Sequence, residues 1–294
     1  MKASSALAPP SAQGARLQLL AGAVLWSSGG VFIKEIRAGA TSITVYRCLI
    51  SAVLLLPLLR GRRFPRLFDM AVAVALFAAL LGLYVGATKE TTAANAIFLQ
   101  YTAPVYVIAL GPWLLGERLS GRDLAAMAVC LTGVALLFAG NRGGDTDGLL
   151  MGLGSGAFYG LFLVWLRRLR YADPIAVTFA NCLGVAVLLA PLPGVWDVAL
   201  RDLGLLVLMA AVQFALPYVL FSRGLQRVAS AEASLLALIE PVLNPIWVAL
   251  VVGEDPSVAT LIGGAVILLG LALRYTVLRT PVADETAFVL EDVV

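Results

Sequence analysis

Histidine is absent from this 294-residue sequence. Its absence excludes the serine–histidine pair of many hydrolases, zinc sites built on histidine, and haem held by a histidine ligand. It also removes the side chain that most often exchanges protons near neutral pH. We therefore expect no catalytic residues, no metal site and no cofactor.

Charged residues are scarce as well. Only 13% of the residues are charged and 61% are hydrophobic, whereas soluble domains carry about 25% charged residues. The charges fall between apolar runs of about twenty residues, the length of a helix that crosses a bilayer core. Continuous runs favour helices over the strands of a barrel, which alternate over about ten residues. We predict an all-α integral membrane protein with ten transmembrane helices, at residues 17–37, 41–59, 67–87, 92–115, 122–140, 148–167, 174–193, 202–222, 229–252 and 257–278.

Cysteine is limited to three residues, Cys48, Cys130 and Cys182. All three lie inside predicted spans, so no disulfide framework is expected.

The arginines and lysines are distributed unevenly between the loops. Clusters such as Arg60–Arg63 and Arg167–Arg170 lie on the side that also carries the amino terminus. Cytoplasmic loops carry an excess of these residues, so we predict that both termini are cytoplasmic, with residues 1–16 and 279–294 as tails. The net charge of +3 follows from this excess and gives no reason to expect nucleic acid as a partner.

The chain contains two copies of one unit. Residues 82–136 reappear as residues 219–273 at a constant offset of 137 residues. The matched pairs include Pro104 with Pro241, and Gly116-Glu117 with Gly253-Glu254. An earlier block also repeats: CLISAVLLLPL, from Cys48, is identical to CLGVAVLLAPL, from Cys182, at eight of eleven positions.

We place the two repeats at residues 17–140 and 148–278, with five spans in each. Because five is odd, the second repeat enters the membrane with the opposite polarity, and a pseudo-two-fold axis in the membrane plane relates the halves. Transporters with such inverted repeats bind their substrate near the midplane, between the halves, and expose it to each side in turn.

Two tracts of the sequence resemble a known family. They are NAIFLQYTAPVYVIALGPWLLGERLSGRDLAAMAVCLTGVALL, at 95–137, and ASLLALIEPVLNPIWVALVVGEDPSVATLIGGAVILLGLAL, at 233–273. Each has an apolar helix with a central proline, Gly-Glu at its end and a glycine-rich helix after it. These features resemble the EamA module of the drug/metabolite transporter superfamily, and AGAVLWSSGGVFIKEI, at 21–36, is similar to the opening helix of that module.

The resemblance covers about residues 17–278. It implies ten helices in two EamA repeats and the export of small metabolites. The whole chain looks closest to the YddG-type exporters of aromatic and other neutral amino acids, which implies a place in the bacterial inner (plasma) membrane.

Polar and aromatic side chains inside the spans are candidate substrate-binding residues. A polar side chain within the membrane is costly and usually faces a partner or a cavity. Flat aromatic walls suit the ring of an aromatic amino acid, and polar groups suit its zwitterionic head. For each residue, the alternative is helix packing or an inter-helix hydrogen bond. The candidates are Trp26, Tyr84, Gln100, Tyr101, Tyr159, Gln213, Tyr218 and Asn244.

Four further residues are candidates for gating or coupling: Arg47, Pro104, Glu240 and Pro241. A proline inside a helix frees a backbone carbonyl, so the two matched prolines are candidate bends, with a static kink as the alternative. Arg47 lies deep in its span, and its repeat counterpart is Asn181. Glu240 could exchange a proton during transport or hold the backbone groups freed next to Pro241.

We predict an exporter of small solutes, namely aromatic and other neutral amino acids, that works by alternating access at a midplane cavity. The expected partners are an amino-acid substrate and membrane lipid, and we expect a monomer. A permease for a nucleoside, a sugar or an organic cation is the alternative. An intramembrane enzyme is a more distant one, because histidine and the Gly-x-Gly-Asp and Gly-x-Ser-x-Gly motifs are all missing.

Overall fold

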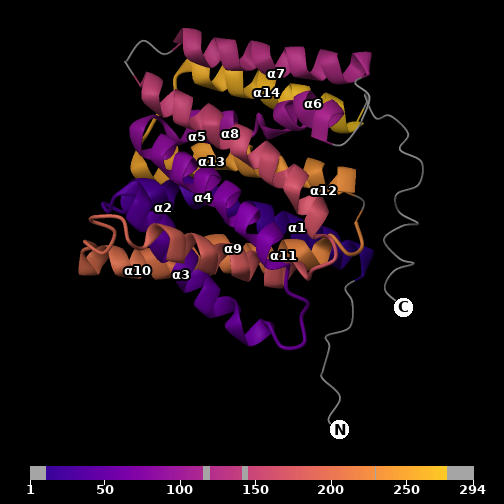
Figure 1. The fold of residues 1–294 in the computed structure, drawn as a ribbon. Helices are drawn as coiled ribbons and strands as arrows, with labels where there is room; N and C mark the ends of the chain where they lie inside the picture. The colour runs from indigo at the N-terminus through magenta and orange to yellow at the C-terminus, as the bar shows by residue number, and fades with distance from the viewer. Residues whose placement is uncertain (1–10, 115–119, 141–144, 229, 277–294) are drawn as a thin grey trace.

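The computed structural model describes residues 11–114, 120–140, 145–228 and 230–276. Within these ranges all regular structure is helical, and Figure 1 shows long helices stacked in layers. The Gly116-Glu117 pair, the tail 279–294 and residues 1–10 of the other tail lie outside the described residues.

The helices follow the predicted spans. Nine helical segments of the described residues are long and apolar enough to cross a membrane, and a tenth, α9, is apolar but has 16 residues. The prediction of an all-α membrane protein with ten helices is confirmed. In chain order the elements are α1 (Ala12–Ser27), α2 (Gly29–Glu35), α3 (Ala40–Leu55), η1 (Leu56–Leu58), α4 (Leu67–Glu90), α5 (Ala93–Gln100), α6 (Ala103–Leu114), α7 (Gly121–Gly140), α8 (Thr146–Leu166), η2 (Arg167–Leu169), α9 (Pro174–Leu189), α10 (Leu200–Leu208), η3 (Met209–Ala215), α11 (Leu216–Gly224), α12 (Ser230–Ala237), α13 (Ile239–Val252) and α14 (Val258–Thr276).

Two helix ends differ from the predicted spans for local reasons. The first helix begins at Ala12 instead of residue 17, because the Ser11 side chain accepts a hydrogen bond from the N–H of Gly14 and caps the helix there. The seventh span ends at Leu189 instead of residue 193. The chain turns after it, and Gly194 adopts a φ of +72° that favours glycine.

Four of the ten spans are interrupted, which the apolar runs did not indicate. The first breaks at Ser28, and the eighth contains a π-helical segment, η3, just before Pro217. The fourth and ninth break at Tyr101–Thr102 and at Leu238. Tyr101 and Leu238 are 137 residues apart, which is the repeat offset, and each precedes its matched proline by three residues. The break is therefore a property of the repeated unit.

Repeat-equivalent residues contact each other at two places. The thiols of Cys48 on α3 and Cys182 on α9 lie in contact, and Sγ of Cys130 on α7 lies 3.6 Å from the backbone oxygen of Ile267 on α14. A residue can contact its own counterpart only beside the symmetry axis. The pseudo-two-fold axis therefore passes through the α3–α9 and α7–α14 contacts, and Figure 1 shows α7 and α14 lying side by side.

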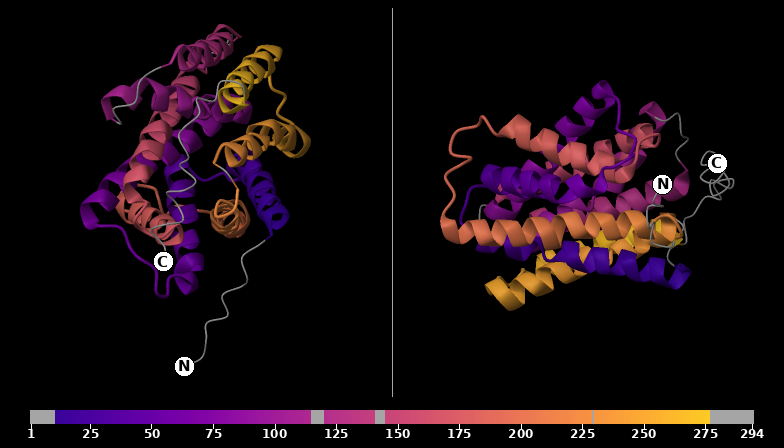
Figure 2. Two further views of the ribbon diagram at one scale, coloured as in Figure 1. Left: turned by 90° about the vertical axis from the view of Figure 1, so that its right-hand side faces the viewer. Right: turned by 90° about the horizontal axis from the view of Figure 1, so that it is seen from below.

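The inverted arrangement also shows in the helix pairs. The third span, α4, packs along the sixth, α8, and its counterpart pair is the eighth span packed along the first. Figure 2 shows this second pair, with α1 beside the α10–α11 span. We call the end of the bundle with the α2–α3, α4–α5 and α13–α14 connections the Lys34 end, and the opposite end, with the α3–α4 and α8–α9 connections, the Arg62 end.

Candidate functional site

The candidate site combines one acidic residue with four tyrosines from four different spans. Glu240 lies on the first turn of α13, directly after the break at Leu238. It is within electrostatic range of the phenols of Tyr84 on α4, Tyr101 at the end of α5, Tyr159 on α8 and Tyr218 on α11. We call these four tyrosines and Glu240 the tyrosine cluster. The fold thus brings together five of the residues that the sequence predicted for the site.

Tyr101 connects the two proline breaks. Its hydroxyl lies 2.8 Å from Oε2 of Glu240 and 3.1 Å from the backbone oxygen of Ala237. Pro241 has no N–H to donate to that carbonyl, so Tyr101 supplies the missing donor from the other half of the protein. A phenol has one proton, so Tyr101 can donate to Ala237 and stay bonded to Glu240 only when the Glu240 carboxyl is protonated.

Two side-chain amides approach the break in the first span. Gln213 Nε2 donates to the backbone oxygen of Trp26 at 3.4 Å. A Cβ at Gly29 would lie 2.8 Å from this Nε2, and a Cβ at Gly30 would lie 2.7 Å from Oδ1 of Asn244. The two glycines therefore let both amides reach the backbone of the first span. Both amides are buried, with Gln213 Oε1 and the two polar atoms of Asn244 unpartnered among the described residues.

An aromatic wall joins the amides to the tyrosine cluster. The ring of Trp26 lies 5.2 Å from that of Tyr218 and 4.8 Å from that of Phe221, and Tyr218 lies 4.9 Å from Phe214. These are favourable spacings for aromatic pairs. Sequence reasoning selected Trp26 and Tyr218 but missed the two phenylalanines, because phenylalanine is common in every apolar span.

Arg47 is buried beside this wall. Its side chain is 1% exposed, and its guanidinium carbon lies 5.0 Å from the centre of the Phe214 ring. It is within electrostatic range of Tyr84 and Tyr218, two members of the tyrosine cluster. Two of its nitrogens, Nε and Nη2, have no hydrogen-bond partner among the described residues.

Gln100 lies in a different set of contacts. Its Nε2 donates to Oγ of Ser155 at 3.2 Å, and that hydroxyl donates to the backbone oxygen of Leu80 at 3.2 Å. The three residues connect α5, α8 and α4. Of the predicted substrate-binding residues, Gln100 therefore has the clearest structural role as an inter-helix hydrogen bond.

Polar contacts tie the two halves together at the Lys34 end. The Lys34 ammonium lies 2.5 Å from Oε2 of Glu254 and donates to the backbone oxygen of Thr91 at 2.7 Å. Oε1 of Glu254 accepts from the N–H of Ala93 at 2.7 Å. Sequence reasoning had not selected Lys34 or Glu254 for the site. The repeated Gly-Glu pair was the available signal, and Gly253 indeed ends α13 with a φ of +75°.

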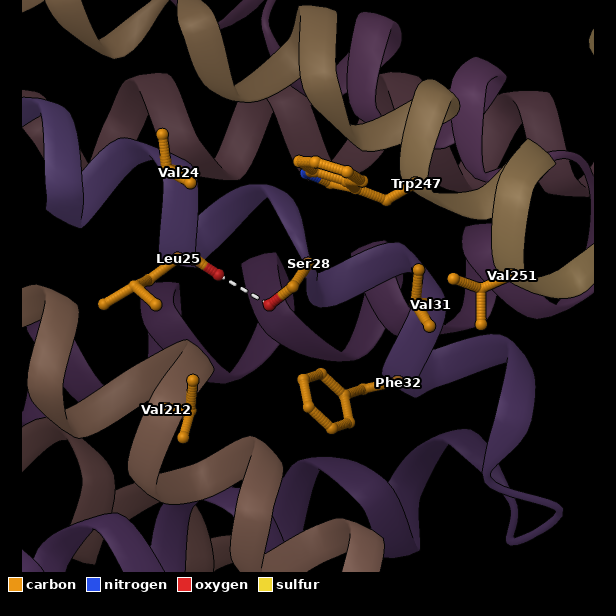
Figure 3. A pocket seen from close by; sticks show the side chains of 8 residues that line it. All are labelled: Val24, Leu25, Ser28, Val31, Phe32, Val212, Trp247 and Val251. Carbon is orange, nitrogen blue, oxygen red and sulfur yellow. Dashed lines mark hydrogen bonds between the residues drawn. The ribbon is translucent and has the colours of Figure 1, made fainter.

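An apolar groove of about 360 Å³ lies outside this site, between α1, α2, η3 and α13 (Figure 3). Its lining includes Val24 and Val251, which are 38% and 61% exposed. Ser28, its one polar lining residue, donates its hydroxyl to the backbone of Leu25 at 2.6 Å. The indole N–H of Trp247, also in the lining, donates to Oγ of Ser27 at 2.9 Å. The side chains that line the groove therefore leave no hydrogen-bond donor free for a carboxylate, and we place the candidate site at the tyrosine cluster.

No cluster of the described residues could hold a metal ion through three or more histidine, cysteine, aspartate or glutamate side chains. The candidate site instead consists of aromatic rings and two buried amides, together with one acidic residue, Glu240, and one cationic residue, Arg47.

Comparisons with known proteins agree on the family. Residues 14–139 and 146–276 each match the EamA-like transporter family, one match for each half. An uncharacterized transporter of Archaeoglobus fulgidus is 33% identical over 261 residues, which cover 86% of this chain and 93% of the relative. An uncharacterized transporter of Bacillus subtilis, YwfM, is 30% identical over 216 residues, which cover 71% of this chain and 72% of the relative.

A solved structure supports the fold. A chain described as the crystal structure of a protein superposes with a TM-score of 0.64 over 91% of this chain and 98% of its own length, at 22% identity.

Proposed function

Because the chain belongs to the EamA-like transporter family, we propose that it exports aromatic and other neutral amino acids by alternating access at the tyrosine cluster. Family membership makes the chain a multi-pass membrane transporter of small molecules and not an enzyme. The amino-acid substrate, in the manner of the YddG-type exporters, is the proposal.

The observation that carries the proposal is the composition of the site. Rings of Trp26 and Tyr218 form an apolar wall, and the buried amides of Gln213 and Asn244 beside it keep polar atoms without partners. A large apolar side chain needs the wall, and a zwitterionic head needs the polar atoms. A sugar would need more polar groups converging on one place.

We further propose that the breaks next to Pro104 and Pro241 are the hinges of alternating access. Both lie at equivalent positions of the two inverted halves, and Tyr101 connects them. In this arrangement the Lys34–Glu254 contact, which joins α2 to the end of α13, holds the Lys34 end closed.

The Arg62 end is the cytoplasmic end in this proposal, with both termini on that side and the protein in the bacterial inner membrane as a monomer. The basic residues support it, because loops at this end hold Arg60, Arg62, Arg63, Arg66, Arg167, Arg168 and Arg170.

A second candidate follows from Glu240. An acidic side chain among four tyrosines also suits an organic cation, since aromatic faces attract cations. An aromatic amine such as phenethylamine therefore belongs in any substrate panel.

The test is counterflow in liposomes that contain the purified protein, with radiolabelled phenylalanine, tryptophan, threonine, alanine and phenethylamine. We expect phenylalanine and tryptophan to be transported. Trp26→Ala should reduce their transport several-fold more than that of threonine or alanine, because one stacking contact is worth about 0.5–1.5 kcal/mol beyond its buried area. Trp113→Ala is the matched control, because Trp113 is 84% exposed. An equal loss of transport for all solutes would indicate that Trp26 has a packing role. Transport of the amine alone would favour a permease for organic cations.

A further inference from the structure

Arg47 brings a positive charge into the protein interior without an acidic partner. It is 1% exposed, and the described residues include no carboxylate within ion-pair distance of it. A buried charge is costly unless it is paired and hydrogen-bonded. The Phe214 ring, 5.0 Å away, interacts with one face of the guanidinium but leaves its edges unsatisfied.

The unpartnered nitrogens lie on a single edge. Nε and Nη2 both lack a hydrogen-bond partner among the described residues. In a guanidinium these two N–H groups point in parallel along the same side, the spacing that fits the two oxygens of a carboxylate in a bidentate pair. A single carboxylate would therefore satisfy both nitrogens at once.

Two helices that approach Arg47 carry unpartnered atoms of the opposite character. Oδ1 of Asn181 and Oε1 of Gln213 are hydrogen-bond acceptors, and both side chains are buried. Asn181 directly precedes Cys182, whose thiol contacts that of Cys48 next to Arg47. Gln213 directly precedes Phe214, on which the guanidinium lies. The two helices that carry these acceptors for an ammonium group are therefore the ones whose next residues, Cys182 and Phe214, lie beside Arg47.

The two halves are unequal at this point. The repeat counterpart of Arg47 is the neutral Asn181. Strict symmetry would have placed a second cation at the equivalent position of the other half, where the sequence has a neutral amide.

We propose that Arg47 binds the carboxylate of the transported amino acid through Nε and Nη2. This inference rests on the proposed function and names the recognition element of the same site. It makes the substrate class an α-amino acid with a free carboxylate and excludes the corresponding amides and amines.

The experiment compares phenylalanine with phenylalaninamide, which lacks the carboxylate, as competitors of labelled phenylalanine in proteoliposomes. We expect the parent protein to prefer phenylalanine. Arg47→Lys keeps the charge but loses the paired geometry. It should therefore weaken the apparent affinity for phenylalanine about 10- to 100-fold, the value of a hydrogen bond to a charged group, and leave the apparent affinity for the amide unchanged.

A second variant separates recognition from structure. Arg47→Met removes an unpaired buried charge at similar volume, so its Tm in detergent should be equal to or above that of the parent, while discrimination between acid and amide is lost. A lower Tm, together with equal losses of affinity for the acid and the amide, would show that Arg47 has a structural role and would overturn the proposal.

The failure of the proposed function gives a different result. If the parent transports no amino acid, 3-phenylpropionate and its amide are compared as ligands that stabilise the protein against heat. Stabilisation by the acid alone that disappears in Arg47→Met would keep the carboxylate site and refute amino-acid export. Absence of any stabilisation would refute both.

Discussion

The hydroxyl of Tyr101 replaces the backbone N–H donor that an uninterrupted helix would have at this position. Pro241 leaves the Ala237 carbonyl without its usual donor, and Tyr101 reaches it from the equivalent break in the other half. The same hydroxyl contacts Glu240. One side chain therefore stabilises a break and links the two candidate hinges.

Tyr101→Phe tests this role at the level of a single atom. We expect the free energy of unfolding in detergent to fall by about 1–3 kcal/mol, because the buried Ala237 carbonyl loses its donor and the Glu240 carboxyl loses its hydrogen-bond partner. The matched control is Tyr159→Phe, since the Tyr159 hydroxyl makes no hydrogen bond within the described ranges. Losses of the same size in both variants would contradict the capping role.

At the scale of elements, two glycines on α8, Gly156 and Gly160, allow it to pack on the break between α5 and α6. A Cβ at Gly156 would lie 2.6 Å from the backbone oxygen of Leu99 and 2.6 Å from Oγ1 of Thr102, and one at Gly160 would lie 2.7 Å from the oxygen of Ala103. Small residues spaced by four allow helix backbones to approach closely. Here the contact covers the irregular backbone of the fourth span, which lipid could not satisfy.

Gly156→Ala should therefore be costly despite its small size. We expect the free energy of unfolding to fall by about 1–3 kcal/mol, as in other overpacked positions, because the added methyl group would meet backbone. Gly82→Ala on α4 is the control: nothing lies within 4 Å of its Cβ position, so the better helix propensity of alanine should leave stability equal or up to about 1 kcal/mol higher. Equal effects would show that α8 can shift away from α5.

At the scale of the whole molecule, two inverted halves form one bundle. Contacts between equivalent residues, Cys48 with Cys182 and Cys130 with Ile267, show that the halves are related across the middle of the protein and not stacked as separate domains. Tyr101 provides a direct hydrogen-bonded contact between one break and its counterpart.

The proposed topology is testable with impermeant thiol reagents. In a background without the three native cysteines, Arg63→Cys and Asp197→Cys should react from opposite sides of the membrane, because these exposed residues lie at opposite ends of the bundle. Residue 63 should react from the cytoplasmic side, as the basic residues around it indicate. Reaction of both from one side would contradict the inverted topology, and the reverse sidedness would contradict cytoplasmic termini alone.

The sequence by itself determined the class of protein, the spans and the duplication. Apolar runs, basic loops and a constant 137-residue offset are local or periodic patterns, and each is visible without knowing which helix faces which. The two matched prolines also marked the positions of two breaks within three residues.

The sequence could not determine which polar side chains meet. Spans that are apolar on all sides give no helical periodicity to show which face points inward, and rotation and tilt are set by packing between helices. Only the tertiary structure decided that Tyr101 reaches Glu240 and Ala237, that Gln100 bonds to Ser155, and that Arg47 keeps one edge of its guanidinium without a partner. Each of these depends on side chains from different spans meeting in three dimensions, which no pattern along one helix encodes.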